Sequence, residues 1–126
     1  MKIFQGIDLV KIKRVRGIHL KFQNKFLQKI FTINEIKQIE KNKKNIDLRI
    51  AGKYASKEAA AKAIGFGISH GIKFKDFEVL NNAHGKPEIT LKGEAQSRIK
   101  QISSSSVSIS HDGEYLISIV TFISNE

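Results

Sequence analysis

Apolar side chains recur at helical spacing through much of the first half of the chain. A short strand is expected first, over residues 2–8, with the carboxylate of Asp8 at its end. Residues 11–30 then repeat apolar positions every three or four residues, and Gly17 is expected to break or bend this stretch. This spacing is typical of helices that bury one face against a core.

A capping signal marks the start of the next helix. Thr32 followed three residues later by Glu35 fits a capping box, in which each side chain satisfies a backbone N–H of the first turn. The helix that begins there is expected to turn Ile33, Ile36 and Ile39 inward.

A longer helix follows a polar loop. Residues 41–45 are all Lys or Asn and predict an exposed loop. The next helix is expected from about residue 47 to residue 64. Gly65 and Gly67 are expected to end it, because glycine adopts the left-handed conformation that terminates helices.

The second half alternates apolar and polar residues with the period of two that predicts strands. The expected elements are a strand around Phe77 and Val79, a turn at 84–87, a return strand at 88–91, a short helix at 93–101, and strands at 107–111 and 116–122 joined through Asp112-Gly113. Helices in the first half and strands in the second predict an α+β fold, organised as one domain over residues 1–126.

The closing hairpin is apolar on both faces. Leu116, Val120 and Phe122 share one face, whereas Ile117 and Ile119 share the other. A domain of this size has helices to cover only one face of such a sheet, so an oligomer is expected.

Positive charge is concentrated in the first half of the chain. Residues 1–62 contain 16 basic and 5 acidic side chains, whereas residues 63–126 contain 6 basic and 7 acidic ones. The basic half predicts a polyanionic partner, which can be a nucleic acid, a phosphate-rich cofactor or an acidic protein.

Composition excludes several classes of protein. The chain has no cysteine, which rules out disulfide scaffolds, thiolate zinc sites and thiol catalysis. No apolar run approaches the ~18 residues that span a bilayer, and the first residues lack the apolar stretch of a secretion signal. No membrane association and a cytoplasmic location are therefore expected.

Two carboxylates and a lysine form the candidate chemistry. Helical spacing places Glu58 and Lys62 on the same face as Ala51 and Ala55, where a surface ion pair between the two charged side chains is the simplest interpretation. Asp8 supplies a second carboxylate at a strand end. Two carboxylates beside a lysine can instead hold a hard divalent cation and a phosphate, which is how magnesium is usually bound.

An ordered set of motifs resembles the holo-acyl-carrier-protein synthases, the small bacterial class of 4′-phosphopantetheinyl transferases. The motifs are GIDLV at 6–10, FT at 31–32 with Glu35, AGKYASKEA at 51–59, GFGI at 65–68, GKP at 85–87 and VSISHD at 107–112. The resemblance implies transfer of phosphopantetheine from coenzyme A to a serine of apo acyl carrier protein, with release of adenosine 3′,5′-bisphosphate. It also implies a homotrimer with active sites at subunit interfaces.

Roles for individual residues follow from the same resemblance. It implies Mg²⁺ ligands at Asp8 and Glu58 and catalytic roles for Glu58, Lys62 and His111. The positions that match coenzyme A contacts are Lys44, Lys53, Lys62, Gly65, Pro87, Ser110 and His111. Glu58 or a water on the cation could accept the serine proton. His111 could equally be a hydrogen-bonded strand residue.

The chain departs from the family pattern at three positions. Lys53 stands where arginine is usual, which keeps the charge but loses the bidentate geometry of a guanidinium. His84 replaces asparagine before the GKP motif, and Lys11 lies where an acidic residue is common.

Basic side chains near the start of the chain predict a docking face for the acidic carrier protein. The residues assigned to it are Lys13, Arg14, Lys21 and Lys25. Two other functions compete with this interpretation. A small nucleic-acid-binding domain would explain the basic half, but the chain has no Trp and only two Tyr for stacking on bases. A metal-dependent phosphohydrolase would use the same cation with water as nucleophile.

Overall fold

The computed structural model describes residues 1–126 as an α+β fold built around one long helix. In chain order the elements are β1 (Lys2–Lys11), α1 (Ile12–Phe22), α2 (Asn24–Ile30), α3 (Ile33–Lys41), α4 (Ile46–Ile64), a short 3-10 turn (Phe74–Asp76), β2 (Phe77–Asn81), β3 (Pro87–Leu91), α5 (Gly93–Arg98), β4 (Ile102–Asp112) and β5 (Tyr115–Ser124). The predicted fold class is confirmed.

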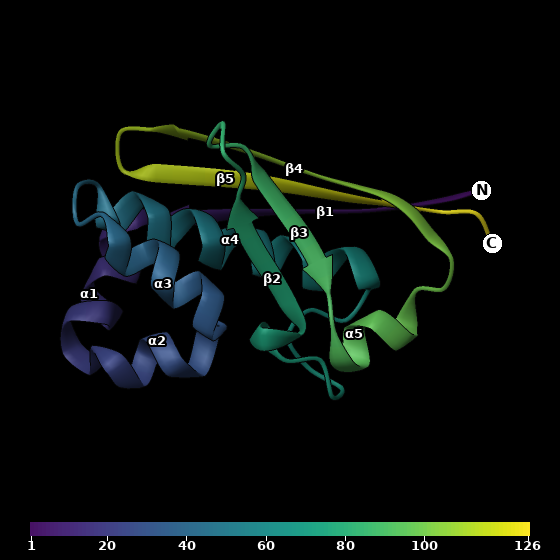
Figure 1. The fold of residues 1–126 in the computed structure, drawn as a ribbon, viewed down its shortest axis with the longest axis horizontal. Helices are drawn as coiled ribbons and strands as arrows, with labels where there is room; N and C mark the ends of the chain where they lie inside the picture. Colours follow the sequence, from purple (N-terminus) through teal and green to yellow (C-terminus); the bar gives the residue numbers. More distant parts are fainter.

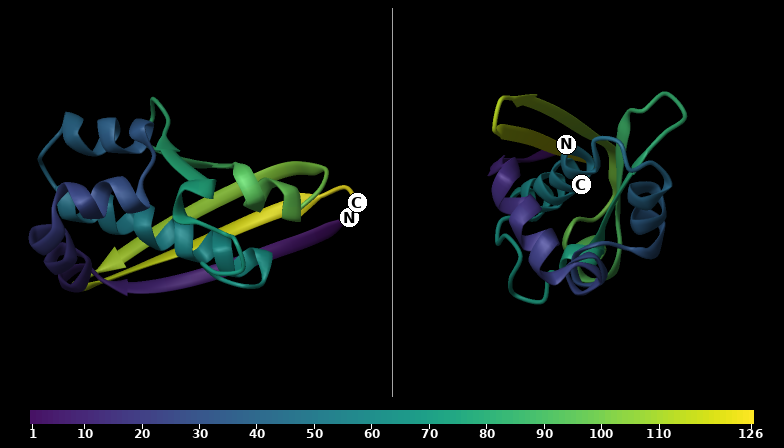
Figure 2. Two further views of the ribbon diagram at one scale, coloured as in Figure 1. Left: turned by 90° about the horizontal axis from the view of Figure 1, so that it is seen from below. Right: turned by 90° about the vertical axis from the view of Figure 1, so that its left-hand side faces the viewer.

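Helix α4 lies between two antiparallel sheets (Figures 1 and 2). On one side is a three-stranded sheet with the order β1-β5-β4, and on the other is the β2–β3 hairpin together with α3. Helices α1 and α2 gather near the first turns of α4, whereas α5 and both chain termini lie toward the other end (Figure 1).

Strand β1 approaches α4 so closely that it requires a glycine. A Cβ on Gly6 would lie 1.9 Å from the carbonyl oxygen of Ala59. Helix α4 also has small residues on its buried surface, namely Ala55, Ala59 and Ala63. Small residues on both elements therefore set the distance between β1 and α4, and with it the position of Asp8.

The core consists of two apolar clusters along α4. One contains Val15, Phe31, Ile39 and other side chains from α1 to α3, and the second contains Phe77, Val120 and Phe122 from the two sheets. The three-stranded sheet is covered on its inner face only. On its outer face Ile3, Ile7, Leu9 and Ile119 are exposed, and Ile117 is partly buried.

Several predicted boundaries are confirmed. The capping box at Thr32 and Glu35 is present, and residues 42–45 separate α3 from α4. Helix α4 ends at Ile64 with Gly65 at φ 116°, the left-handed cap that the glycine predicted. The β2–β3 hairpin also occupies the expected segments.

Other local predictions are wrong. Helix α1 continues through Gly17, which costs only about 1 kcal/mol when the helix packs through Val15, and the break falls at Gln23 with φ 46°. Ile33 is 69% exposed, because six residues of helix place it about 120° away from buried Ile39.

Pairing across the sheet moves two strand boundaries. Strand β1 extends beyond Asp8 to Lys11, because each of these residues still pairs with β5. The closing turn is Gly113-Glu114 instead of Asp112-Gly113, since Asp112 pairs with Tyr115. No helix of the chain is both long enough and apolar enough to span a membrane.

Candidate active site

Asp8 and Lys62 meet between β1 and α4. Asp8 lies on the helix-facing side of β1, and its side chain is only 13% exposed. The Lys62 Nζ donates to Asp8 Oδ1 at 2.8 Å and to the Ile7 carbonyl oxygen at 3.1 Å. The partner of Lys62 is therefore Asp8, and the surface ion pair between Lys62 and Glu58 is not formed.

Glu58 is half-buried on α4 near this pair. Burial raises its pKa, and the negative charge of Asp8 raises it further, whereas a hydrogen bond from Tyr54 and the charges of Lys62 and Arg14 act in the opposite direction. Each carboxylate disfavours the ionised form of the other, and a cation placed between them would stabilise both in the ionised form.

The donor set fits magnesium. No group of three or more His, Cys, Asp or Glu side chains exists that could enclose a metal ion. Mg²⁺ does not need one, because it is commonly held by one or two carboxylates together with waters and substrate phosphates. Asp8 and Glu58 therefore suit a magnesium ion that is shared with a phosphorylated substrate, and they do not suit zinc or a closed structural site.

A cavity of about 410 Å³ collects three of the residues assigned to coenzyme A. Lys53, Pro87 and His111 reach it from α4, β3 and β4. Its other walls are formed by Leu48, Arg49, Gly52, Val79, Asn81, Gly85, Ile109 and Leu116. The volume lies in the range of small-molecule pockets, and its lining combines apolar surface with basic groups.

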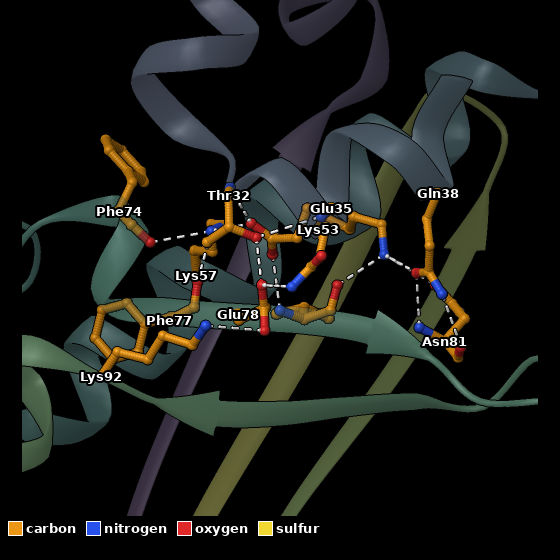
Figure 3. A network of polar contacts seen from close by, with 12 residues as sticks. Thr32, Glu35, Gln38, Lys53, Lys57, Phe74, Phe77, Glu78, Asn81 and Lys92 are labelled. Carbon is orange, nitrogen blue, oxygen red and sulfur yellow. Dashed lines mark hydrogen bonds and ion pairs between the residues drawn. The ribbon is translucent and has the colours of Figure 1, made fainter. Parts of the chain in front are cut away.

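Lys53 is a structural member of this cavity wall. Its side chain is buried, and its Nζ donates to Val79 O at 2.7 Å and to Gln38 Oε1 and Asn81 Oδ1 at 3.0 Å (Figure 3). Burial lowers the pKa of Lys53 to about 8. The ammonium thus joins α4 to α3 and to the end of β2.

The remaining assigned positions lie outside the cavity lining. Lys44 is exposed in the loop before α4, although its carbonyl oxygen accepts a hydrogen bond from Arg49, which does line the cavity. Gly65 caps α4 at its far end, and Ser110 is an exposed residue of β4 opposite Ile117.

The two groups of predicted residues lie on opposite sides of α4. Lys62 lies nine positions after Lys53, which corresponds to about 180° around a helix and about 13 Å along it. The contacts agree, because Lys53 bonds to β2 and Lys62 bonds to β1. The structure therefore does not bring the carboxylate site and the cavity of one chain together.

The four residues predicted to dock the carrier protein are spread over α1 and α2. Lys13 pairs with Glu114 at 3.2 Å, and Arg14 and Lys21 are exposed on α1. Arg14 is near enough for its charge to lower the pKa of Glu58. Lys25 lines an apolar groove of about 360 Å³ together with Ile18, Phe22, Phe26, Lys29, Ile30, Tyr54 and Phe74.

A buried polar network around Lys57 was not predicted from the sequence. Lys57 and Glu35 form an ion pair at 2.7 Å with both side chains fully buried (Figure 3). Lys57 also donates to the carbonyl oxygens of Phe77 at 2.6 Å and Phe74 at 3.0 Å. The only signal in the sequence was that Lys53 and Lys57 lie one turn apart on an alanine-rich helix.

The family is shown by comparison with known proteins. The model of the 4′-phosphopantetheinyl transferase superfamily matches residues 5–120. A holo-[acyl-carrier-protein] synthase of Campylobacter hominis is 45% identical over 118 residues, covering 91% of this chain and 93% of the relative. The chain belongs to this superfamily and is a phosphopantetheinyl transferase, as its motifs predicted.

Solved structures agree with the sequence match. The holo-[acyl-carrier-protein] synthase of Helicobacter pylori, solved in complex with coenzyme A, is 34% identical and superposes with a TM-score of 0.82, covering 94% of this chain and 99% of that one. The synthase of Neisseria meningitidis gives the same TM-score at 30% identity, covering 95% and 97%.

Proposed function

We propose that this enzyme transfers 4′-phosphopantetheine from coenzyme A to a serine of apo acyl carrier protein and releases adenosine 3′,5′-bisphosphate. The observation that carries the proposal is the meeting of Asp8, Glu58 and Lys62 between β1 and α4, at the motif positions of the family. Relatives named for this reaction support the two substrates, and one of them has been solved with coenzyme A bound.

Asp8 and Glu58 would hold a magnesium ion. When bound, the ion supplies positive charge to the pyrophosphate oxygens, which is the main requirement of phosphoryl transfer. With Asp8 engaged in this way, the half-exposed ammonium of Lys62 is free to turn toward the phosphates. Three charged side chains of this chain thereby account for binding and orientation of the pyrophosphate.

The transfer is a displacement at phosphorus. The serine Oγ forms a bond to the phosphorus that carries the pantetheine arm, the bond from that phosphorus to the bridging oxygen breaks, and the leaving adenosine 3′,5′-bisphosphate keeps the electron pair. Lys62 can stabilise or protonate the leaving phosphate. Glu58 or a water would accept the serine proton.

We further propose that the working enzyme is a homotrimer with active sites shared between subunits. The carboxylate site and the cavity lie on opposite sides of α4, so one coenzyme A molecule can use both only if they come from different chains. The exposed apolar face formed by Ile3, Ile7, Leu9 and Ile119 supports such an assembly.

Equilibrium sedimentation tests the assembly. We expect a single species of three times the 14.2 kDa chain mass at micromolar concentration. Ile7→Glu, which places a charge at a half-exposed position of the apolar face, should dissociate it, because an unpaired charge in an interface is strongly unfavourable. A monomer of wild-type chain would contradict the shared site.

The basic face of α1 is proposed as the docking surface for the carrier protein. Arg14→Glu should raise the KM for acyl carrier protein at least about tenfold, or ~1.4 kcal/mol, and leave the KM for coenzyme A nearly unchanged. The effect should shrink as salt screens the two surfaces. A parallel rise in both KM values would instead assign α1 to the cofactor site or to assembly.

Incubation with coenzyme A, magnesium and apo acyl carrier protein tests the function itself. Transfer should increase the carrier-protein mass by roughly 340 Da, the size of the phosphopantetheine arm. Release of adenosine 3′,5′-bisphosphate without that gain would identify a phosphohydrolase, and neither product would favour the nucleic-acid-binding alternative. The cytoplasmic location stays a prediction.

A further inference from the structure

Lys53 lines the cavity between α4, the β2–β3 hairpin and the end of β4, and all its N–H donors are engaged by the protein. An ammonium group has three N–H donors, and Lys53 directs them at three protein acceptors between 2.7 and 3.0 Å. If Lys53 turned to a phosphate, at least one of these acceptors would lose its partner. Loss of the buried Val79 contact would cost about 1–3 kcal/mol, whereas exposed Asn81 could turn to water. Lys53 therefore has little more than the one N–H that it donates to Asn81 to offer an anion in this cavity.

Arg49 is the neighbouring cation with donors left over. It lies one turn before Lys53 on α4 and lines the same cavity. Its two Nη atoms donate to the carbonyl oxygens of Lys44 and Ile39, which use two of its five N–H groups. Its Nε is the only buried side-chain polar atom of the chain that has no hydrogen-bond partner.

The guanidinium of Arg49 also lacks a counterion. The six ion pairs of the chain involve Lys13, Arg16, Lys57, Lys62, Lys92 and Arg98, and none includes Arg49. A partly buried positive charge with spare donors attracts an anion, and the planar guanidinium suits phosphate through paired hydrogen bonds. The two backbone contacts hold this group against α3 and against the loop that contains Lys44.

We infer that Arg49 binds the 3′-phosphate of coenzyme A and takes the main anion-binding role in this cavity in place of Lys53. The inference rests on the proposed function. Coenzyme A has two phosphate sites, and its pyrophosphate belongs with Asp8, Glu58 and Lys62. The phosphate left for the cavity is therefore the one on the ribose. Leu48, Pro87 and Ile109 provide apolar surface beside it for the adenosine.

Coenzyme A and 3′-dephospho-coenzyme A separate this role from a structural one. For Arg49→Gln we expect the KM for coenzyme A to rise at least about tenfold, with kcat within about twofold and the KM for the dephospho form unchanged. The KM of Arg49→Lys for coenzyme A should lie between the values for the wild-type protein and Arg49→Gln, because lysine keeps the charge but not the paired hydrogen bonds of a guanidinium. Arg98→Gln is the matched control, since Arg98 pairs with Glu94 on α5 and does not line the cavity. Equal increases for both donors, or no increase for either, would overturn the inference.

Thermal unfolding gives a readout that does not depend on turnover. Adenosine 3′,5′-bisphosphate should raise the melting temperature of the wild-type protein and of Arg98→Gln more than adenosine 5′-monophosphate does, and this difference should vanish in Arg49→Gln. A difference that survives in Arg49→Gln would refute the assignment. Wild-type protein that shows the difference but transfers no phosphopantetheine would refute the proposed function and leave the Arg49 site supported.

Discussion

Asp8→Ala and Glu58→Ala should each lower turnover by at least roughly a hundred- to a thousandfold while the fold is retained. Each variant removes one of only two carboxylates that can hold the cation at this site. Little stability should be lost, because Lys62, the partner of Asp8, is half exposed and remains hydrated, and Glu58 is only half-buried.

Steady-state rates over a range of magnesium concentrations, with thermal unfolding of the same samples, measure both effects. Removal of divalent cations with a chelator should abolish wild-type activity, and added magnesium should restore it. Asp47→Ala is a suitable control, because Asp47 is also a carboxylate paired with a basic side chain, Arg16 at 3.4 Å, but lies at the start of α4. Full turnover of Asp8→Ala or Glu58→Ala at saturating magnesium would exclude these residues as ligands.

Local signals were sufficient for the elements whose ends are determined by a few neighbouring residues. The capping box at Thr32 and the glycine cap after Ile64 act within one helical turn, so the sequence predicts both correctly. The end of β1 is different. Nothing local extends the strand from Asp8 to Lys11, and it continues because β5, more than a hundred residues later, provides pairing partners as far as Tyr115.

The same distinction explains what could be predicted of the site. Asp8 and Glu58 were predicted as cation ligands from their motifs, and that role stays a prediction. The partner of Lys62 was predicted from helical spacing alone, but β1 brings Asp8 within 2.8 Å, which no rule about neighbouring residues could reveal. Burial of Lys53 and Lys57 was equally hidden, because their acceptors include backbone carbonyls of β2 and of the turn before it.

Lys57→Met should destabilise the protein by about 3–5 kcal/mol, the largest stability effect we expect from any single lysine. The reason is that Glu35, the partner of Lys57, would remain in the core. Glu35 is fully buried and would lose its counterion, although the backbone N–H groups of Thr32 and Val79 would still donate to it. The carbonyl oxygens of Phe74 and Phe77 would also lose a donor.

Urea denaturation of Lys57→Met and Lys62→Met provides a matched comparison on the same helix. Lys62 also forms an ion pair at 2.8 Å, but it is half exposed, so its loss should cost no more than about 1 kcal/mol. The double variant Glu35→Gln, Lys57→Met should recover part of the lost stability, because it removes the buried charge. The recovery should be incomplete, because the single amide oxygen of Gln replaces two carboxylate oxygens that accept from Thr32 and Val79. A cost for Lys57→Met no larger than that for Lys62→Met would show that the buried pair contributes nothing beyond an exposed one.

Activity should follow the opposite order: Lys62→Met stays folded and is slow, whereas Lys57→Met, which retains Asp8, Glu58 and Lys62, turns over as long as it is folded.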